Sequence, residues 1–170
     1  MSEPIDRRGF IKSAAGSTVA LASLQVFGIS ADHAPGCKFF SAGQAATLKA
    51  IAEQFVPQDD LPGAEKAGVL FYIDGLLSGK FGRFYTERYQ SGLRLVNELS
   101  QKEFHNDFAS LANDQQLSVL HTLESGTDGA AEGPRFFALI LQHTMEGYYG
   151  DPEHGGNRGN VSWQWIGFEG

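Results

Sequence analysis

From residue 41 onward, apolar residues recur at steps of three and four, which is the spacing of one face of an α-helix. The first helix predicted in this way carries its apolar residues at Leu48, Ile51, Ala52 and Phe55. Ser41 and Gln44 have the spacing of a capping box, so this helix should begin beside Ser41. Pro57 should end it, because proline lacks the backbone N–H that a continuing helix needs.

The same spacing predicts four more helices. Their apolar residues are Val69, Ile73, Leu76 and Leu77; then Phe84, Tyr85, Tyr89, Leu93, Val96 and Leu99; then Leu117, Leu120 and Leu123; then Phe137, Ile140, Leu141, Thr144 and Tyr148. The second helix should close at Gly79, and the third, over about 83–102, should be the longest. Asn113 with Gln116 is a cap-like start for the fourth, and Pro134 fits the first turn of the fifth. No stretch alternates long enough to predict a strand, so the expected fold is all-α with about five helices.

The segment from Gly150 onward has a different composition. It contains six glycines and a proline, and a single regular helix is therefore excluded. It nevertheless ends in large apolar residues, namely Trp163, Trp165, Ile166 and Phe168. Because such a sequence is too apolar for a disordered end, we expect a long irregular Gly/Trp-rich segment that folds back on the helices or docks on another protein.

The first thirty residues have the order of an export signal. Arg7 and Arg8 are followed by Phe10, an aliphatic residue and Lys12, and an apolar stretch occupies 18–29. This is the pattern read by the twin-arginine (Tat) pathway, which moves folded proteins. The apolar stretch is shorter than the roughly 20 residues of a spanning helix, so it is not interpreted as a membrane anchor. We predict a leader and flexible start over 1–34.

The remaining residues, 35–170, are predicted to form one compact helical domain, since 170 residues with 42% apolar content suit a single core. The formal charge of −7 gives no basic field for a phosphate backbone, so nucleic acid is not an expected partner. An acidic surface of this kind also adsorbs poorly to anionic lipid. Cys37 is the only cysteine, so it either stays a free thiol or forms a disulfide with another chain.

Motifs for cofactors and catalysis are scarce. The sequence has no Gly-x-Gly-x-x-Gly between a strand and a helix, no Gly-Lys-Ser/Thr phosphate loop and no Cys-x-x-Cys-His haem motif. The sharpest enzyme-like feature is a pair of His-x-x-Glu motifs, His121 with Glu124 and His143 with Glu146, each on one helix face. Two such helices side by side would suit an independent metal-dependent enzyme, although carboxylate-bridged bundles use the opposite order. The alternative is that both histidines are half-buried, hydrogen-bonded packing residues.

Three segments carry a resemblance to a known family. They are Phe55-Val56-Pro57-Gln58-Asp59-Asp60-Leu61-Pro62-Gly63-Ala64 continuing to Asp74; Phe136-Phe137 through His143-Thr144-Met145-Glu146-Gly147-Tyr148-Tyr149-Gly150-Asp151-Pro152; and Gly155-Gly156-Asn157-Arg158 with Val161, Trp163, Ile166, Gly167, Phe168 and Gly170. Together they make the chain similar to the gluconate 2-dehydrogenase subunit 3 family, the small (gamma) subunits of membrane-associated gluconate, fructose, sorbitol and glucose dehydrogenases. The middle of the chain, about 80–129, matches that family only in being helical.

The resemblance implies a non-catalytic accessory subunit that binds no cofactor itself. The implied partners are an FAD-dependent flavoprotein of the glucose-methanol-choline type, a multihaem cytochrome c that carries haem c, and the Tat translocase. The subunit would stabilise the flavoprotein and carry it into the periplasm. Membrane association would then come only through partner subunits, and the sugar oxidised is not readable from this chain.

The C-terminal segment is where we expect the contact with the flavoprotein. Proline, glycine and asparagine should build a rigid series of turns there, and large aromatic residues should anchor the interface. Tyr149 and Trp165 are expected to be exposed, whereas Trp163 and Phe168 could equally close the helical core. The full predicted set is Tyr148, Tyr149, Asp151, Pro152, Gly155, Gly156, Asn157, Trp163, Trp165 and Phe168.

Overall fold

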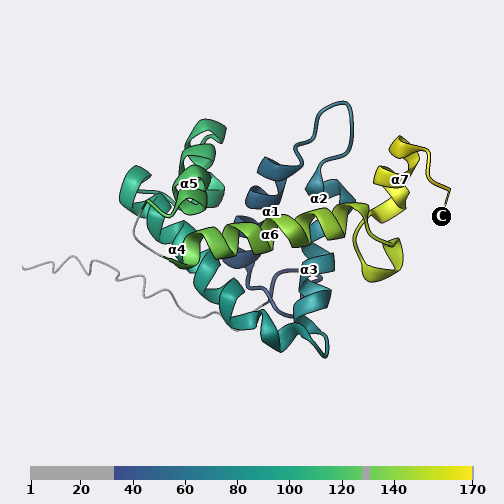
Figure 1. Ribbon diagram of the computed structural model, residues 1–170, viewed down its shortest axis with the longest axis horizontal. Helices are drawn as coiled ribbons and strands as arrows, with labels where there is room; N and C mark the ends of the chain where they lie inside the picture. The colour runs from purple at the N-terminus through teal and green to yellow at the C-terminus, as the bar shows by residue number, and fades with distance from the viewer. Residues whose placement is uncertain (1–32, 128–130, 170) are drawn as a thin grey trace, which may run out of the picture.

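The computed structural model describes residues 33–127 and 131–169, and within these ranges the chain is helical with no strand (Figure 1). The α-helices are α1 (Ala42–Phe55), α2 (Ala64–Ala67), α3 (Val69–Ser78), α4 (Thr86–Phe104), α5 (Asn113–Ser125), α6 (Glu132–Tyr149) and α7 (Val161–Ile166). Short 3₁₀-helices are η1 (Gly82–Phe84), η2 (Phe108–Ser110), η3 (Pro152–His154) and η4 (Arg158–Asn160). The all-α prediction is confirmed. The five predicted helices correspond to α1, α3, α4, α5 and α6, and the two additional helices, α2 and α7, are too short to show a period.

Helix α1 begins and ends where the sequence predicted. The Ser41 hydroxyl accepts from the Gln44 backbone N–H at 3.4 Å, and the Gln44 side chain accepts from the Ser41 N–H at 3.1 Å. The helix stops at Phe55, two residues before Pro57. Helix α3 likewise stops at Ser78, with Gly79 as its C-cap.

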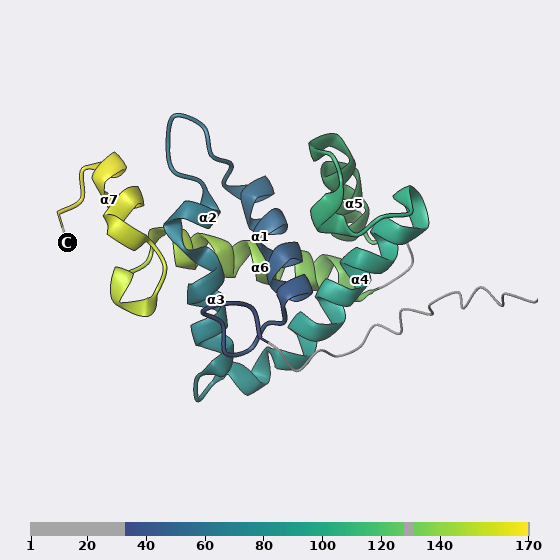
Figure 2. The ribbon, with the colours of Figure 1, turned by 180° about the vertical axis from the view of Figure 1, so that it is seen from behind.

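Helix α6 is the central element of the fold. Figures 1 and 2 show it crossing the molecule, and it packs against α1, α2, α3, α4 and α5. The core between these helices contains large side chains with no solvent exposure, including Phe40, Leu48, Ile51, Ile73, Tyr89, Val96, Phe108, Val119, Leu123 and Ile140. Burial of this apolar surface is what holds the helices together.

Two details of α5 and α6 differ from the sequence prediction. Asn113 is the first residue of α5 rather than its cap; Ala112 is the N-cap, and its N–H donates to Gln115 Oε1 at 3.0 Å. Helix α6 buries Phe136, not Phe137. Periodicity selected Phe137, but the adjacent Phe136 is the buried residue because its ring approaches a glycine of α4 closely.

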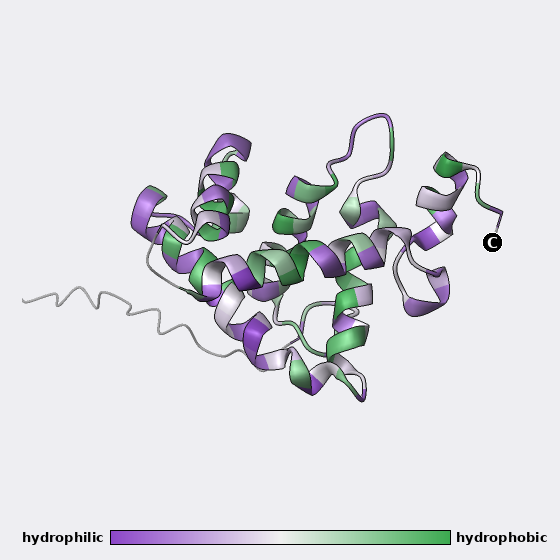
Figure 3. Cartoon of the chain, in the orientation of Figure 1, coloured by the Kyte–Doolittle hydropathy of each residue, from purple (hydrophilic) through white to green (hydrophobic). Residues whose placement is uncertain are grey.

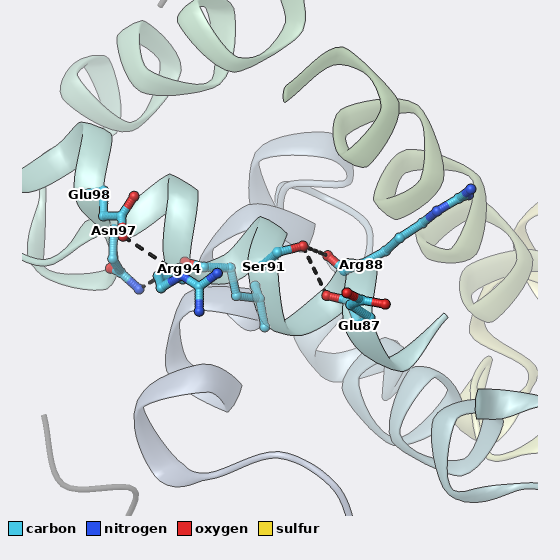
Figure 4. Close-up of polar contacts among 7 residues, drawn as sticks. Glu87, Arg88, Ser91, Arg94, Asn97 and Glu98 are labelled. Atoms are coloured by element: carbon cyan, nitrogen blue, oxygen red, sulfur yellow. Dashed lines mark hydrogen bonds and ion pairs between the residues drawn. The ribbon is translucent and has the colours of Figure 1, made fainter. Parts of the chain in front are cut away.

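The solvent-facing side of α4, the longest helix of the described chain, carries local polar contacts (Figure 4). The Ser91 hydroxyl donates to the Glu87 carbonyl at 2.9 Å. Arg94 forms an ion pair with Glu98 at 3.7 Å, one turn further along. Both charged side chains are exposed, so this pair contributes little to stability.

Most helices carry hydrophobic and hydrophilic residues in alternation along the ribbon (Figure 3), and many of the apolar side chains are buried in the core. The large apolar side chains that remain exposed gather mainly at the α3–α4 connection and in the C-terminal segment: Phe81, Phe84, Leu117, Tyr149, Trp165, Ile166 and Phe168. Within the described ranges, every helix is too short or too polar to cross a membrane.

Candidate functional site

The segment after α6 is a series of tight turns. Asp151 accepts the Glu153 N–H at 2.9 Å, and Pro152 opens the short helix η3. Beyond it, Gly155, Asn157 and Asn160 all have positive φ angles, of 95°, 41° and 57°. These are conformations that glycine and asparagine adopt most readily, so turns are present where the sequence predicted them.

Asn157 holds this segment to the rest of the chain. Its backbone N–H donates to the Gly147 carbonyl at 2.8 Å, and its side-chain amide donates to the Gly150 carbonyl at 3.0 Å. Its Oδ1 accepts from both the backbone N–H and the hydroxyl of Ser162, at 3.0 and 2.8 Å. Asn157 and Ser162 have no solvent exposure. One buried amide therefore ties the end of α6 to the start of α7.

Gly156 permits the close approach that these bonds require. A Cβ at this position would overlap the Gly147 carbonyl oxygen. Gly147 in turn lies against the Tyr72 ring, 2.9 Å from where its own Cβ would be. Both glycines are buried, so the tail backbone packs directly on α6, and α6 in turn packs closely on α3.

Helix α7 presents the apolar residues of the segment outward. Ile166, Phe168 and Trp165 are 56%, 53% and 58% exposed, and Tyr149 at the end of α6 is 43% exposed. Trp163 is half-buried, and its indole N–H donates to the Tyr149 carbonyl at 2.8 Å. The Phe168 ring meets the Trp163 ring edge-on, with centroids 4.9 Å apart. We call Tyr149, Trp163, Trp165, Ile166 and Phe168 the tail surface.

The structure gives the solvent exposure of the residues predicted for the interface, and their contact with a partner stays a prediction. Tyr149 and Trp165 are exposed as expected, and Phe168 does not close the core. Tyr148, Gly156 and Asn157 are buried within the chain itself, so their side chains support the surface instead of forming it. Glycine and asparagine in sequence signal a turn, but they do not reveal whether the turn lies on the outside or against a helix.

The three segments that carry the family resemblance meet at this end of the molecule. The Tyr148 hydroxyl donates to the Pro62 carbonyl at 2.8 Å, which joins α6 to the α1–α2 loop. The Arg158 guanidinium lies 3.8 Å from the centroid of the Phe71 ring, which joins the tail to α3. Figures 1 and 2 show α2, the end of α6 and α7 next to one another.

The two His-x-x-Glu motifs are not brought together. His121 and Glu124 lie exposed on α5, with the His121 side chain 79% exposed and 3.8 Å from the Glu124 carboxylate. His143 is buried on α6, and its Nδ1 is 2.9 Å from the Tyr89 hydroxyl. The packing interpretation thus holds for His143 but not for His121. No group of three or more His, Cys, Asp or Glu residues in the described ranges is arranged to hold a metal ion.

A partly buried polar cluster that the sequence did not predict surrounds His143. Tyr89 stacks on the His143 ring, while Tyr72 donates to Glu146 at 3.0 Å. Burial lowers the pKa of His143, against the opposing effect of Glu146, and burial together with Glu146 raises the pKa of Tyr72 to about 12. Both groups are therefore neutral at pH 7, and the cluster stabilises the packing of α3, α4 and α6.

Cys37 lies in the loop before α1, half-buried beside Asp74. The Asp74 carboxylate is itself buried and accepts the backbone N–H groups of Lys38, Phe39 and Phe40 at 2.8, 2.9 and 3.2 Å. Burial and, next, Asp74 raise the pKa of the Cys37 thiol to about 11. Because the thiolate is the reactive form, this thiol is a slow partner for disulfide exchange at neutral pH.

The predicted export residues Arg7, Arg8, Phe10 and Lys12 lie outside the described residues, as does almost all of the predicted leader.

Comparison with protein families gives one match that covers most of the chain. The family described as Gluconate 2-dehydrogenase subunit 3 matches residues 42–170. The chain belongs to the gluconate 2-dehydrogenase subunit 3 family.

The family match includes all the described helices and the whole tail surface. As a subunit 3 protein, the chain belongs with the components of a multisubunit dehydrogenase, as the family name states. No curated protein and no solved structure gives a significant match to this subunit 3 chain.

Proposed function

We propose that this chain is a non-catalytic accessory subunit of a periplasmic FAD-dependent sugar or polyol dehydrogenase, and that it binds the flavoprotein subunit through the tail surface. The observation that carries the proposal is the cluster of exposed aromatic residues at the end where the three family-like segments meet. In the complex, FAD belongs to the flavoprotein and haem c to a further cytochrome subunit. This chain supplies binding and stability.

The chemistry of the tail surface suits a permanent interface. Trp165 and Phe168 offer large apolar area and have few rotatable bonds, so immobilising them costs little entropy. An aromatic residue that is more than half exposed in the isolated chain gains the full benefit of burial only against a partner. A surface with several such residues favours association with another protein over a monomer in solution.

The tail surface is also pre-organised. The Asn157 hydrogen bonds and the close contact at Gly156 fix the backbone before any partner arrives. Binding then orders little new backbone, and less of the interaction energy is lost as entropy. This arrangement favours a subunit that recognises an already folded flavoprotein.

Export gives the second part of the proposed role. A flavoprotein acquires its cofactor while folding in the cytoplasm, so it needs a pathway that accepts folded cargo. The twin-arginine pattern around Arg7 and Arg8 would provide that pathway for both chains if they travel together. The subunit would thus act as an export escort as well as a stabilising partner.

The binding role is tested with Trp165→Ala and Tyr149→Ala in the co-expressed complex. An anchor residue at the centre of an interface costs about 2 kcal/mol or more when cut to alanine, which is roughly a 30-fold loss of affinity. The matched control is Leu117→Ala, since Leu117 is 40% exposed on α5, away from the tail surface. If both tail variants bind the flavoprotein like the control, the interface lies elsewhere.

The export role is tested by replacing Arg7 and Arg8 with lysine. The receptor reads the arginine pair, so both this chain and its flavoprotein should stay in the cytoplasm on fractionation. The tail variants Trp165→Ala and Tyr149→Ala give the complementary result. With them, the subunit should be exported normally while the flavoprotein stays in the cytoplasm. Normal export of the flavoprotein with the lysine variant would contradict the escort role.

A further inference from the structure

The connection between α3 and α4 carries the second group of exposed aromatic residues. Phe81 and Phe84 are 64% and 65% exposed, the highest values among the large apolar residues of the described chain. In both Figures 1 and 2 this connection forms the lower corner of the molecule, with α7 higher up at the side. It is therefore a different surface from the tail surface.

A basic side chain accompanies each of these rings. The Lys80 ammonium lies 5.7 Å from the centroid of Phe81, and the Arg83 guanidinium lies 5.3 Å from that of Phe84. Residues 79–85 contain no acidic residue, so the corner has a local charge of +2 in a chain whose formal charge is −7. The corner thus combines exposed rings and cations in a chain whose net charge is negative.

The backbone of the corner is tightly held, so the rings project from a firm base. Gly82 is buried, and a Cβ there would overlap the backbone carbonyl of Leu77. The Tyr85 N–H donates to the Gly82 carbonyl at 2.8 Å, and the Thr86 hydroxyl donates to the same carbonyl at 3.2 Å. These contacts close the turn that places Phe81 and Phe84 outside.

We infer that this corner, made of Lys80, Phe81, Arg83 and Phe84, docks on an anionic lipid surface. A projecting corner can place phenyl rings at the boundary between headgroups and acyl chains, while lysine and arginine pair with lipid phosphates. Charge complementarity selects this occupant, because the positive corner meets a negative membrane surface. The chain would then contact the membrane directly, beyond its contact with the flavoprotein and in addition to any attachment through partner subunits.

The acidity of the whole chain does not prevent this contact. At physiological ionic strength the screening length is about 8 Å, so charges on the far side of the molecule are largely screened from the lipid. The corner charges lie nearest to the surface and dominate the interaction. The whole-chain expectation of poor adsorption to anionic lipid therefore does not apply to this corner.

The first test is flotation of the purified full chain with vesicles of phosphatidylcholine alone and with added phosphatidylglycerol. The chain should float with the anionic vesicles, and less so in 0.5 M salt. Phe81→Ala with Phe84→Ala should lower the partition coefficient at least about tenfold, because both rings lose their apolar contact. Lys80→Gln with Arg83→Gln should lower it by about 25-fold, at about fivefold per cation.

The controls separate the corner from the rest of the chain. Leu117→Ala removes an exposed apolar side chain on α5, and Arg94→Gln removes a cation whose charge Glu98 already pairs (Figure 4). Both should float like the unaltered chain. If the corner variants bind vesicles as well as the unaltered chain does, another segment binds the lipid and the proposal is wrong. The proposal is also wrong if the unaltered chain does not bind anionic vesicles at all.

A local readout keeps the test decisive if the N-terminal apolar stretch also binds vesicles. In a Cys37→Ser background, a polarity-sensitive dye on Phe84→Cys should shift to the blue with anionic vesicles, whereas a dye on Asp114→Cys of α5 should not. No shift at position 84 refutes membrane insertion. If the corner variants still bind vesicles but no longer assemble into the dehydrogenase complex, the corner contacts a protein partner instead. That result would equally overturn the proposal.

Discussion

Replacing Asn157 with alanine should loosen the whole C-terminal segment while leaving the helical core folded. The side chain makes one bond to the Gly150 carbonyl and accepts two from Ser162, and all of these groups lie in the interior of the segment. Alanine removes the three bonds and leaves the buried hydroxyl and N–H of Ser162 without this acceptor. The left-handed backbone at φ 41° adds a smaller cost.

The expected size of the effect follows from these contacts. Each hydrogen bond contributes about 1 kcal/mol net, so their loss lowers the free energy of opening the tail by about 3 kcal/mol. That corresponds to a roughly hundredfold larger equilibrium constant for opening of the tail. Asn160→Ala is the matched control, because Asn160 is also an asparagine with positive φ, at 57°, but it is exposed and makes no side-chain hydrogen bond within the described residues.

Hydrogen exchange followed by mass spectrometry measures the opening directly. Peptides from 147–169 should exchange about a hundredfold faster in Asn157→Ala, or reach the unprotected rate, while peptides from α1 and α4 keep their protection. Asn160→Ala should change the tail rates by only a few fold. If the two variants exchange alike, the Asn157 side chain does not hold the tail, and the argument from its hydrogen bonds is wrong.

Three further predictions concern the core and its titratable groups. Gly92→Ala should lower the free energy of unfolding by about 1–2 kcal/mol, because the added methyl group would overlap a phenylalanine ring of α6. Gly75→Ala should raise the free energy of unfolding by about 0.5–1 kcal/mol, because this position in α3 has open space around it. Urea denaturation measures both changes. Alkylation of Cys37 should rise about tenfold per pH unit up to about pH 10, since its pKa is raised to about 11, and a plateau near pH 9 would contradict this. Burial lowers the pKa of His143 below its usual 6.5, so the unfolded chain binds the proton first and stability is lost as the pH falls below about 6.5. The urea-derived loss of stability between pH 7.5 and 5.5 should be smaller in His143→Gln than in the unaltered chain, and an equal loss would contradict this.

Much of the fold could be predicted because its signals are local. The capping box at Ser41, the stop before Pro57 and the end of α3 at Gly79 depend on residues within one turn of each other. Helical periodicity also located α4 well. It placed Phe137 on the buried face instead of Phe136, because the burial of Phe136 depends on contact with a different helix.

The site was less predictable because it depends on contacts between distant segments. The exposure of Tyr149 and Trp165 followed from their neighbours, but the burial of Asn157 depends on carbonyls of α6 that only the folded chain brings close. The Asp74 carboxylate gives another case, since its three donors lie more than thirty residues earlier in the chain. The spacing of residues along the sequence does not predict contacts between segments that lie so far apart.

The most direct test of the accessory role is mild purification of the chain from the periplasm of its own cells, followed by identification of the co-purifying proteins and an absorption spectrum. The account predicts a flavoprotein in fixed ratio to this chain, with the FAD spectrum assigned to that partner and no metal bound to the subunit. A chain that purifies alone, with a stoichiometric metal and oxidoreductase or hydrolase activity of its own, would contradict it.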